Sequence, residues 1–285
     1  LLFLACLVVS VIGHLDSRMG CRVGRVVANA LVSDLIVGRL EIGRIDRLSL
    51  DGIVARHVSL YGRDGKRVIQ GNRIYLVIDP WAATRGVLRF SHAHLNRGTL
   101  RLETLPDGDL SFLDALEAAD DTPSNPNDPP FHAIVDDMRV ERITAYGDFL
   151  GLRGIVAQDV HVQMRMEFER DVDIRIYSGA GRVVAPFPYV GHLDAVTAVI
   201  RGDPHAGIEV HARAHAGEDR IRVGVRYAVP EGQPDDAPSE LDLIAHADPV
   251  RMSRLVESGF DWAGIFLGRG RGYVRLYGPV DQLRL

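Results

Sequence analysis

The chain has 285 residues, enough for about two domains of ordinary size. Its hydrophobic content of 46% and charged content of 25% are typical of a folded protein and exclude an intrinsically disordered one. The 33 basic and 38 acidic residues give a net charge of −5, which argues against a nucleic-acid partner because phosphate binding needs a basic surface. Two cysteines are too few for a disulfide scaffold or a four-cysteine metal site.

The amino-terminal residues 1–13, LLFLACLVVSVIG, are apolar except for Ser10. A membrane-spanning helix needs about 20 apolar residues, and this chain begins inside the run without a methionine. Three interpretations compete: a cleaved signal peptide, a buried strand or core helix, and an anchor helix whose first residues are missing. The residues after the run, 13–16, make a poor cleavage site. We therefore expect residues 1–13 to be a truncated transmembrane anchor.

Residues 14–37 are the next predicted element, an amphipathic helical connector that ends before Gly38. The helix face could pack on protein or lie at a bilayer surface, and the sequence leaves both open. Five apolar residues recur there at helical spacing: Val23, Val26, Val27, Ala30 and Leu31.

From Gly38 onward the apolar period changes from about 3.6 residues to two, which is typical of strands with one dry and one wet face. Residues 160–169 (VHVQMRMEFE) show this most clearly, because apolar and polar side chains alternate strictly there. Turn residues rich in glycine and aspartate separate such runs, as at 63–65 and 217–219. We therefore predict a mostly β chain with antiparallel strands whose apolar side chains share one face.

Four segments interrupt the strands. Residues 110–119 (LSFLDALEAA) and 249–257 (PVRMSRLVE) are short amphipathic stretches that predict helices. Residues 121–130 and 230–239 are rich in proline and aspartate and predict loops. The first loop is taken as the boundary between one β segment, residues 38–120, and a second, residues 131–285, which we expect to continue beyond this sequence.

Histidines are the first candidates for chemistry. His92 and His94 would place two imidazoles on one strand face, and His205, His211 and His215 lie close together in the sequence. A metal site needs three or four convergent ligands with supporting hydrogen bonds, and the alternation places His211 on a wet face. Polar-face residues are the favoured interpretation. Since the sequence also lacks hydrolase, metalloprotease and P-loop motifs, we expect no enzyme activity, no cofactor and no metal.

The order of strands and turns resembles a known family. The pattern starts at 38–52 (GRLEIGRIDRLSLDG) and continues through 55–60 (ARHVSL), 72–81 and 85–90 (RGVLRF). A corner of the type DG-x-L follows at 107–113, and residues 272–280 (GYVRLYGPV) run from a strand into Gly-Pro. Over nearly its whole length the chain is similar to the amino-terminal portion of TamB-type proteins, the inner-membrane component of the translocation and assembly module in the AsmA-like group.

This resemblance implies a long sheet curved into a groove, a β-taco-like fold, on a single-pass inner-membrane anchor with most of the chain in the periplasm. It implies that the groove carries phospholipid between the inner and outer membranes and supports outer-membrane biogenesis. It also implies an outer-membrane assembly partner reached through a missing carboxy-terminal region. Two alternatives stand beside it: a membrane-anchored β-sandwich with a structural or adhesive role, and a scaffold for outer-membrane protein assembly and autotransporter secretion.

In the groove interpretation, the apolar strand faces contact the acyl chains of phospholipid. The candidate groove residues are the apolar members of the alternating runs, namely Ile74, Leu76, Ile78, Leu100, Leu102, Val160, Val162, Met164, Met166, Phe168, Val172, Ile174, Ile176, Ile208, Val210, Ile221, Val223 and Val225.

Overall fold

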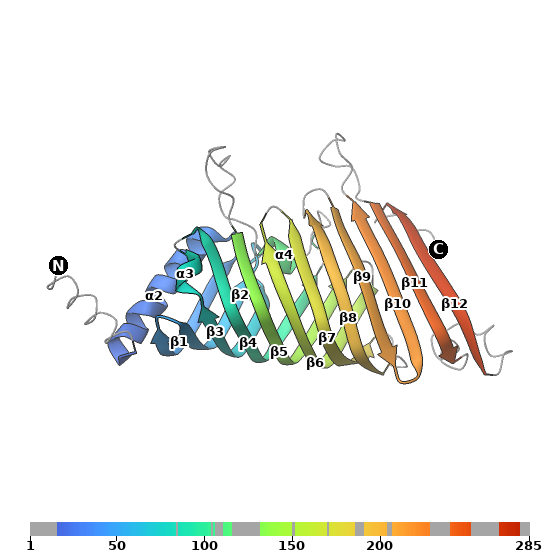
Figure 1. Cartoon of the computed structure of the whole chain (residues 1–285), viewed down its shortest axis with the longest axis horizontal. Helices are drawn as coiled ribbons and strands as arrows, with labels where there is room; N and C mark the ends of the chain where they lie inside the picture. The colour runs from blue at the N-terminus through green and yellow to red at the C-terminus, as the bar shows by residue number, and fades with distance from the viewer. Residues whose placement is uncertain are drawn as a thin grey trace. The chain divides into compact units, whose positions relative to one another are not determined.

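The fold was obtained as a computed structural model, shown along the chain in Figure 1. Helices in it are α2 (Arg18–Leu35), α3 (Pro80–Ala83) and α4 (Ser111–Asp114). The structure describes residues 16–83, 85–103, 105, 111–115, 132–149, 152–169, 171–185, 191–203, 207–228, 240–251 and 268–279.

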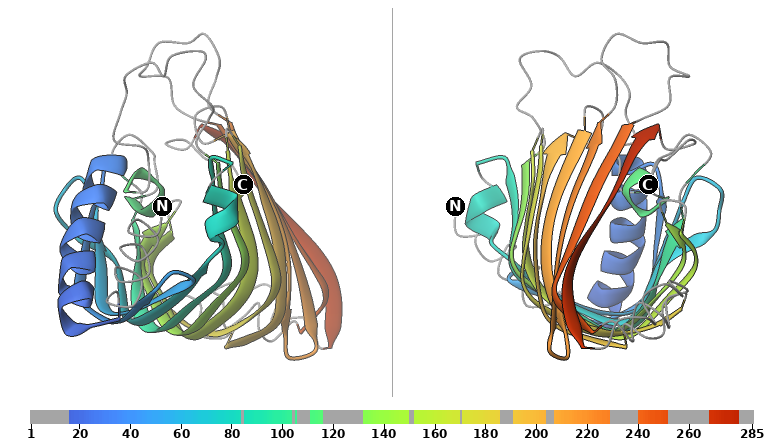
Figure 2. Two further views of the ribbon diagram at one scale, coloured as in Figure 1. Left: turned by 60° about the vertical axis from the view of Figure 1, so that its left-hand side comes forward. Right: turned by 90° about the vertical axis from the view of Figure 1, so that its right-hand side faces the viewer.

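Strands make up most of the described chain, and each of the twelve except the last pairs with the strand that follows it in sequence. All strand pairs with a defined register are antiparallel. The prediction of a mostly β, antiparallel, curved sheet is therefore confirmed (Figures 1 and 2). The strands are β1 (Arg39–Ser49), β2 (Gly52–Tyr61), β3 (Arg67–Ile78), β4 (Val87–Glu103), β5 (His132–Phe149), β6 (Leu152–Phe168), β7 (Val172–Ala185), β8 (His192–Asp203), β9 (Gly207–Ala216), β10 (Asp219–Ala228), β11 (Glu240–Arg251) and β12 (Arg269–Pro279).

The chain divides into two compact units, residues 1–143 and 144–285, and the division falls inside β5. The first unit holds β1 to β4 with most of β5, and the second holds the rest of β5 with β6 to β12. The predicted boundary loop, residues 121–130, lies outside the described residues.

Helix α2 covers the outer edge of β1 in the first unit (Figure 2). An edge strand exposes backbone N–H and C=O groups that can pair with another chain. The Asn29 side-chain oxygen accepts a hydrogen bond from the N–H of Ile42 at 2.9 Å, and the Asp16 carboxylate accepts one from the N–H of Leu48 at 3.3 Å. Side chains of the helix and of Asp16, which precedes it, thus occupy edge positions that a further strand would need.

Small side chains form the face of α2 that contacts β1. Cys21 is buried there as a thiol, and burial raises its pKa, so it stays protonated and acts as a packing residue. A Cβ added to Gly24 would lie 2.6 Å from a methyl group of Leu48. Arg25 donates a hydrogen bond to the carbonyl oxygen of Gly43 at 2.7 Å. Close approach of helix and strand therefore depends on small residues at this face.

A buried apolar cluster lies where α4 meets β2 and β3 in the first unit. Leu60, Val68 and Ala115 are each no more than 5% exposed. An ion pair of 2.8 Å between Arg63 and Asp114 holds α4 at this place. Helix α4 is the described part of the predicted helix 110–119, whose residues 116–119 lie outside the described residues. Three partly buried residues pack around the cluster: Ile36, Ile69 and Phe112.

Positive φ angles bend three strands of the first unit. His57, Arg97 and Arg142 have φ angles of 52°, 55° and 55°, values that are uncommon outside glycine. A neighbouring glycine makes room at the first bend, since a Cβ on Gly43 would lie 3.1 Å from the Cβ of His57. Such bends add curvature to a sheet and change the phase of side-chain alternation.

The phase change keeps apolar side chains of β3 and β4 on one face. A Cβ added to Gly71 would contact the side chains of Leu95 and Ile74. Strict alternation would place positions 71 and 74 on opposite faces of the sheet, because they are an odd number of residues apart. Ile69 lies on the same side as Gly71 by alternation, and Leu100 is directly opposite Ile69. Ile69, Ile74, Leu95 and Leu100 therefore share a face.

The second unit bends in the same way at β6 and β8. Asp159 and Ala195 have φ angles of 50° and 49°, and the strand register shifts at both places. Two glycines on the intervening strand allow close approach, because a Cβ added to Gly179 would lie 3.1 Å from the Cβ of Val196 and Gly181 is similarly crowded.

Other predicted elements have different outcomes. The helix predicted over 249–257 is wrong in its first three residues, because Pro249–Arg251 continue β11 and pair with β12 around 269–270; residues 252–257 lie outside the described residues. So do the predicted anchor, residues 1–13, and the loop at 230–239. No helix among the described residues is long and apolar enough to cross a membrane. The described strands form one open sheet, not the two packed sheets of a β-sandwich.

The glycine at position 98 gives a direct test of the bend. A Cβ there would collide with the backbone carbonyl of Gln70 on the paired strand, and backbone cannot move aside as a flexible side chain can. We expect Gly98→Ala to lower the free energy of unfolding by about 1–3 kcal/mol, the usual cost of forced overpacking, measured by urea unfolding. Gly272→Ala is the matched control because its Cβ would meet open space, and it should stay within about 0.5 kcal/mol of the parent. Equal losses in both variants would contradict this role for Gly98.

Candidate apolar binding surface

One face of the second unit carries rows of apolar side chains that cross consecutive strands from β6 to β12. We call this surface the apolar face. Its side chains are directly opposite one another in the hydrogen-bonded register, so neighbours in a row lie about 4.5–5.5 Å apart. The central row is Met166, Ile174, Ile200, Val210, Val225 and Leu243.

Two further rows flank the central row. One is Met164, Ile176, Ala198, Ala212, Val223, Ala245 and Val274. The other is Phe168, Val172, Gly202, Ile208, Tyr227, Leu241 and Gly278.

The structure thus brings the thirteen candidates of the second unit to one face. Ten of them lie in the three rows, and Ile221 lies beside these rows opposite Ala214 and Ala247. Val162 is paired with Gly179, near the bend of β6, and Val160 lies close to Gly181. In β9 and β10 the apolar face follows from the alternation alone.

The five candidates of the first unit also share a face, because the bend at Arg97 changes the phase of side-chain alternation in β4. Ile74 is paired with Leu95 and Leu76 with Ala93, while Leu100 and Leu102 lie beyond the bend and keep the same orientation. Ile78 pairs with Phe90 past a register shift.

All eighteen candidates are half-buried, and none is enclosed. Among the described residues, no large side chain is completely shielded from solvent. In a closed sandwich the inward-facing residues of both sheets fill the core and lose nearly all solvent contact. Here a single layer of strands leaves the apolar surface partly uncovered, which is the condition that a hydrophobic ligand needs.

The opposite face of the second unit is polar and held by ion pairs. Asp173 accepts two hydrogen bonds from the Arg175 guanidinium, both 2.9 Å, and one from Arg201 on the next strand at 3.2 Å. Asp242 accepts two from Arg275 at 2.8 Å. Hydrogen bonding by these arginines holds the pKa of both carboxyls below its usual value.

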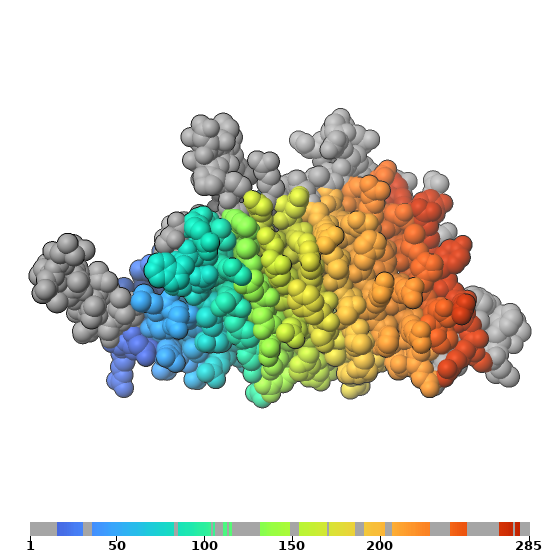
Figure 3. Space-filling view, in the orientation of Figure 1, coloured from blue at the N-terminus to red at the C-terminus, as the bar shows by residue number. Residues whose placement is uncertain are grey.

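Charge on one face and apolar rows on the other fix which side of the sheet can meet a hydrophobic ligand. Figure 3 shows one side of the molecule, where no other described element covers the strands from β6 to β10. A bound acyl chain on the polar face would desolvate the arginines and carboxylates without compensation.

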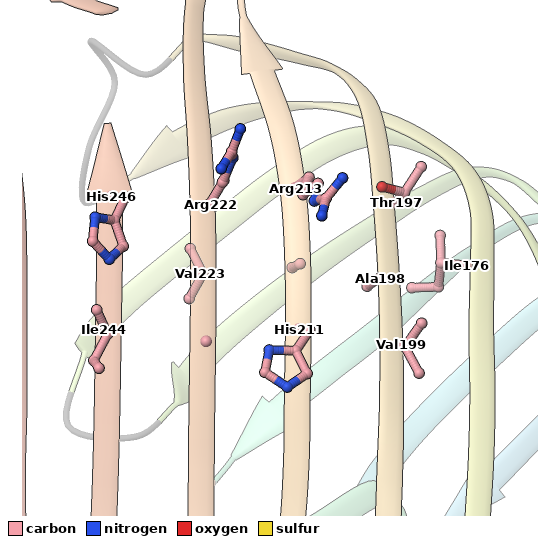
Figure 4. Close-up of a pocket in the computed structure, with 12 residues that line it drawn as sticks. Ile176, Thr197, Ala198, Val199, His211, Arg213, Arg222, Val223, Ile244 and His246 are labelled. Atoms are coloured by element: carbon pink, nitrogen blue, oxygen red, sulfur yellow. The ribbon is translucent and has the colours of Figure 1, made fainter. Parts of the chain in front are cut away.

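A depression of about 520 Å³ lies across β7 to β11 of the second unit (Figure 4). Its lining includes Arg213 and Arg222, whose backbones are paired, together with His211 and His246. His211 contacts Glu209 at 3.0 Å. These basic and imidazole groups lie beside apolar side chains such as Val223 in the lining.

The predicted histidine pair lies in the first unit and interacts with carboxylates of β5. His92 is 3.0 Å from Asp137, and His94 is 3.5 Å from Glu141. The two imidazole rings have centroids 6.5 Å apart. Within the described part of the chain, no group of three or more histidine, cysteine or acidic residues is arranged to hold a metal ion. His215 lies on β9, and His205 lies outside the described residues.

Sequence reasoning missed strand β8 and its contribution to the central row, Ile200. Alternation in residues 192–203 changes phase at Ala195, where φ is 49°, so a strict period of two does not fit the whole strand. Ala198 and Ile200 beyond the bend do alternate with Thr197 and Val199, and this short run was the available signal.

Comparisons with protein-family models, with curated proteins and with solved structures gave no match for this chain.

The ion pairs around Asp173 give a pH-dependent test. Because the folded pKa of this carboxyl is lowered, its contribution to stability is present above the unfolded pKa of about 3.9 and is lost as pH falls through the folded value. Asp173→Asn should cost up to about 1 kcal/mol of unfolding free energy at pH 7, as expected for a solvent-accessible pair. That cost should shrink below about pH 4 and also in about 1 M salt, both measured by urea unfolding. A cost independent of pH and salt would assign the effect to packing instead.

Proposed function

We propose that this chain binds the acyl chains of phospholipid along its apolar face and carries phospholipid between the inner and outer membranes. The observation that carries the proposal is that the ten candidate residues in the three continuous rows are all half-buried. When an apolar ligand covers apolar surface that is partly in contact with water, the free energy falls by about 25 cal/mol per Å² of surface covered.

The dimensions of a row suit an acyl chain. The central row crosses six strands, and five spacings of about 4.8 Å make a length of roughly 24 Å. The hydrocarbon core of a bilayer is about 30 Å thick and holds two leaflets, so one acyl chain extends about 15 Å. A chain lying across the strands would therefore contact several side chains of one row, each buried methylene contributing about 0.8 kcal/mol.

The side chains of the apolar face suit a ligand that varies in shape. Met164 and Met166 are unbranched and flexible, so they adapt to irregular apolar partners. The second row contains alanines at 198, 212 and 245, which leave space between larger neighbours. Binding of this kind needs no reacting group.

Transport between the two membranes and the location in the periplasm rest on the resemblance to TamB-type proteins. That resemblance supports an inner-membrane anchor formed by residues 1–13, a periplasmic sheet and an outer-membrane assembly partner. These parts of the proposal stand on the order of strands, turns and glycines in the sequence.

A charge placed in the central row tests lipid binding. Val210→Glu puts a carboxylate among acyl contacts, and we expect at least a tenfold loss of bound phospholipid because an unpaired charge is costly in an apolar contact. Thr197→Glu is the matched control, since it adds the same charge to an exposed position on the opposite face, where its backbone is paired with Arg213. Native mass spectrometry of purified protein measures bound lipid, and circular dichroism checks the fold. Full lipid retention by folded Val210→Glu, or equal loss in both variants, would contradict the proposal.

Transfer is a separate expectation from binding. The full chain should move a fluorescent phospholipid from donor to acceptor vesicles, measured by loss of quenching, and Val210→Glu should lower the initial rate in proportion to its loss of bound lipid. If the protein binds phospholipid but does not accelerate its transfer, the acyl-binding part of the proposal stands and the transport part is contradicted.

A further inference from the structure

The side of α2 that faces away from β1 exposes four large apolar side chains. Met19 is 76% exposed, Val23 54%, Val26 62% and Val27 47%. We call these residues the outer stripe. They follow one another at helical spacing on one face, while Cys21 and the small residues beside it contact β1. Figure 2 shows no other described element of the first unit on the far side of α2.

Basic side chains accompany the outer stripe. Arg18 and Arg22 are exposed, and helical geometry places them along one flank of the stripe. The first turn of α2 has no acidic residue, and Asp34 near the far end is the single acidic residue in its sequence. The amino-terminal half of the helix therefore presents an apolar stripe with a positive border.

We propose that the outer stripe docks α2 parallel to the surface of an anionic phospholipid bilayer. Helices that lie in the interface combine an apolar face with basic residues and a low overall hydrophobicity, and α2 matches each feature. The role of this docking rests on the proposed function, because docking would hold the acyl-binding strands of the protein beside a membrane.

The charge and the size of the stripe favour a bilayer over a protein partner. Arginines at the border complement anionic headgroups, and each contributes about 1 kcal/mol near such a surface. A second copy of the chain would bring the same arginines against each other. Four side chains on one helix also offer much less than the roughly 800 Å² per partner of a stable protein interface.

The anchor that the sequence predicts would place a membrane at this end of the helix. Residues 1–13 are apolar and lie only a few residues before α2 begins at Arg18. The predicted anchor would bring the chain to the bilayer surface next to Met19.

Photocrosslinking identifies the occupant of the stripe in the full chain. A benzophenone amino acid replaces Val26, and the protein is reconstituted into vesicles of phosphatidylcholine with or without phosphatidylglycerol. We expect lipid adducts by mass spectrometry, with a yield at least fivefold higher on the anionic vesicles, the factor expected for one arginine near the surface. The same probe at Arg73, an exposed residue of β3, is the control and should give few lipid adducts on either vesicle.

Charge removal tests the border. Arg18→Gln/Arg22→Gln with the probe at Val26 should bring the ratio of adduct yields on anionic and neutral vesicles to within about twofold of one, because the attraction to headgroups is lost. A ratio unchanged by the double substitution would overturn the anionic specificity. Crosslinks between two chains would overturn the proposal in favour of a second copy, and crosslinks to residues 1–13 would show that the chain covers its own stripe.

Failure of docking and failure of acyl binding can be told apart. Val26→Glu should abolish docking yet retain phospholipid in native mass spectrometry, since Val26 lies outside the apolar face. Val210→Glu should lose bound phospholipid yet keep the lipid adducts at position 26. Loss of both properties in either variant would overturn the separation of the two surfaces.

Discussion

Backbone hydrogen bonding between consecutive strands is the interaction on which both units depend. Each strand between the two edge strands pairs with its predecessor and its successor in sequence, so the main-chain groups of these inner strands are satisfied without a second layer of structure. A single layer has two faces. If one face is to bind a hydrophobic ligand, the charged side chains must lie on the other face. The ion pairs of Asp173 and Asp242 occupy one face, and the uninterrupted rows occupy the other. The same pairing explains why the apolar face can stay open, since stability does not require a partner sheet to close over it.

A curved sheet of this kind must bend without mixing its faces. In a strict period of two, an inserted or omitted residue would move all subsequent side chains to the opposite face. Residues with positive φ, such as His57, Arg97 and Ala195, bend the strand and restore the phase at the same point. Glycines on neighbouring strands, including Gly43 and Gly179, accept the close backbone approach that results. The bends at these residues therefore both curve the sheet and keep the apolar face continuous.

The sequence predicts this sheet best where alternation is unbroken. Val210, Val225 and their neighbours were assigned to one face correctly, because β9 and β10 contain no bend and their registers are regular. Strand β8 was missed because a bend at Ala195 breaks the pattern, and a non-glycine residue in a positive φ conformation has no reliable sequence signal. The helix predicted at 249–257 fails at its start for another reason: pairing with β12 overrides an amphipathic spacing that is too short to form a stable helix alone. The sequence did not predict which face of α2 contacts β1. Small residues such as Gly24 form that face because they let the two backbones come close, and a hydrophobicity pattern does not show this.

Helix α2 resolves a problem that the strand pairing creates. A single-layer sheet ends in edge strands whose backbone groups invite aggregation, and a helix that packed its largest apolar residues on β1 would leave few polar side chains to reach those groups. With Cys21 and Gly24 against the strand, the helix lies close enough for Asn29 and Arg25 to bond to the β1 backbone. The large side chains are then forced to the far side, where Met19 and Val26 meet solvent. Exposure of the outer stripe is thus the consequence of edge protection, and a bilayer at that side would satisfy both surfaces of the helix at once.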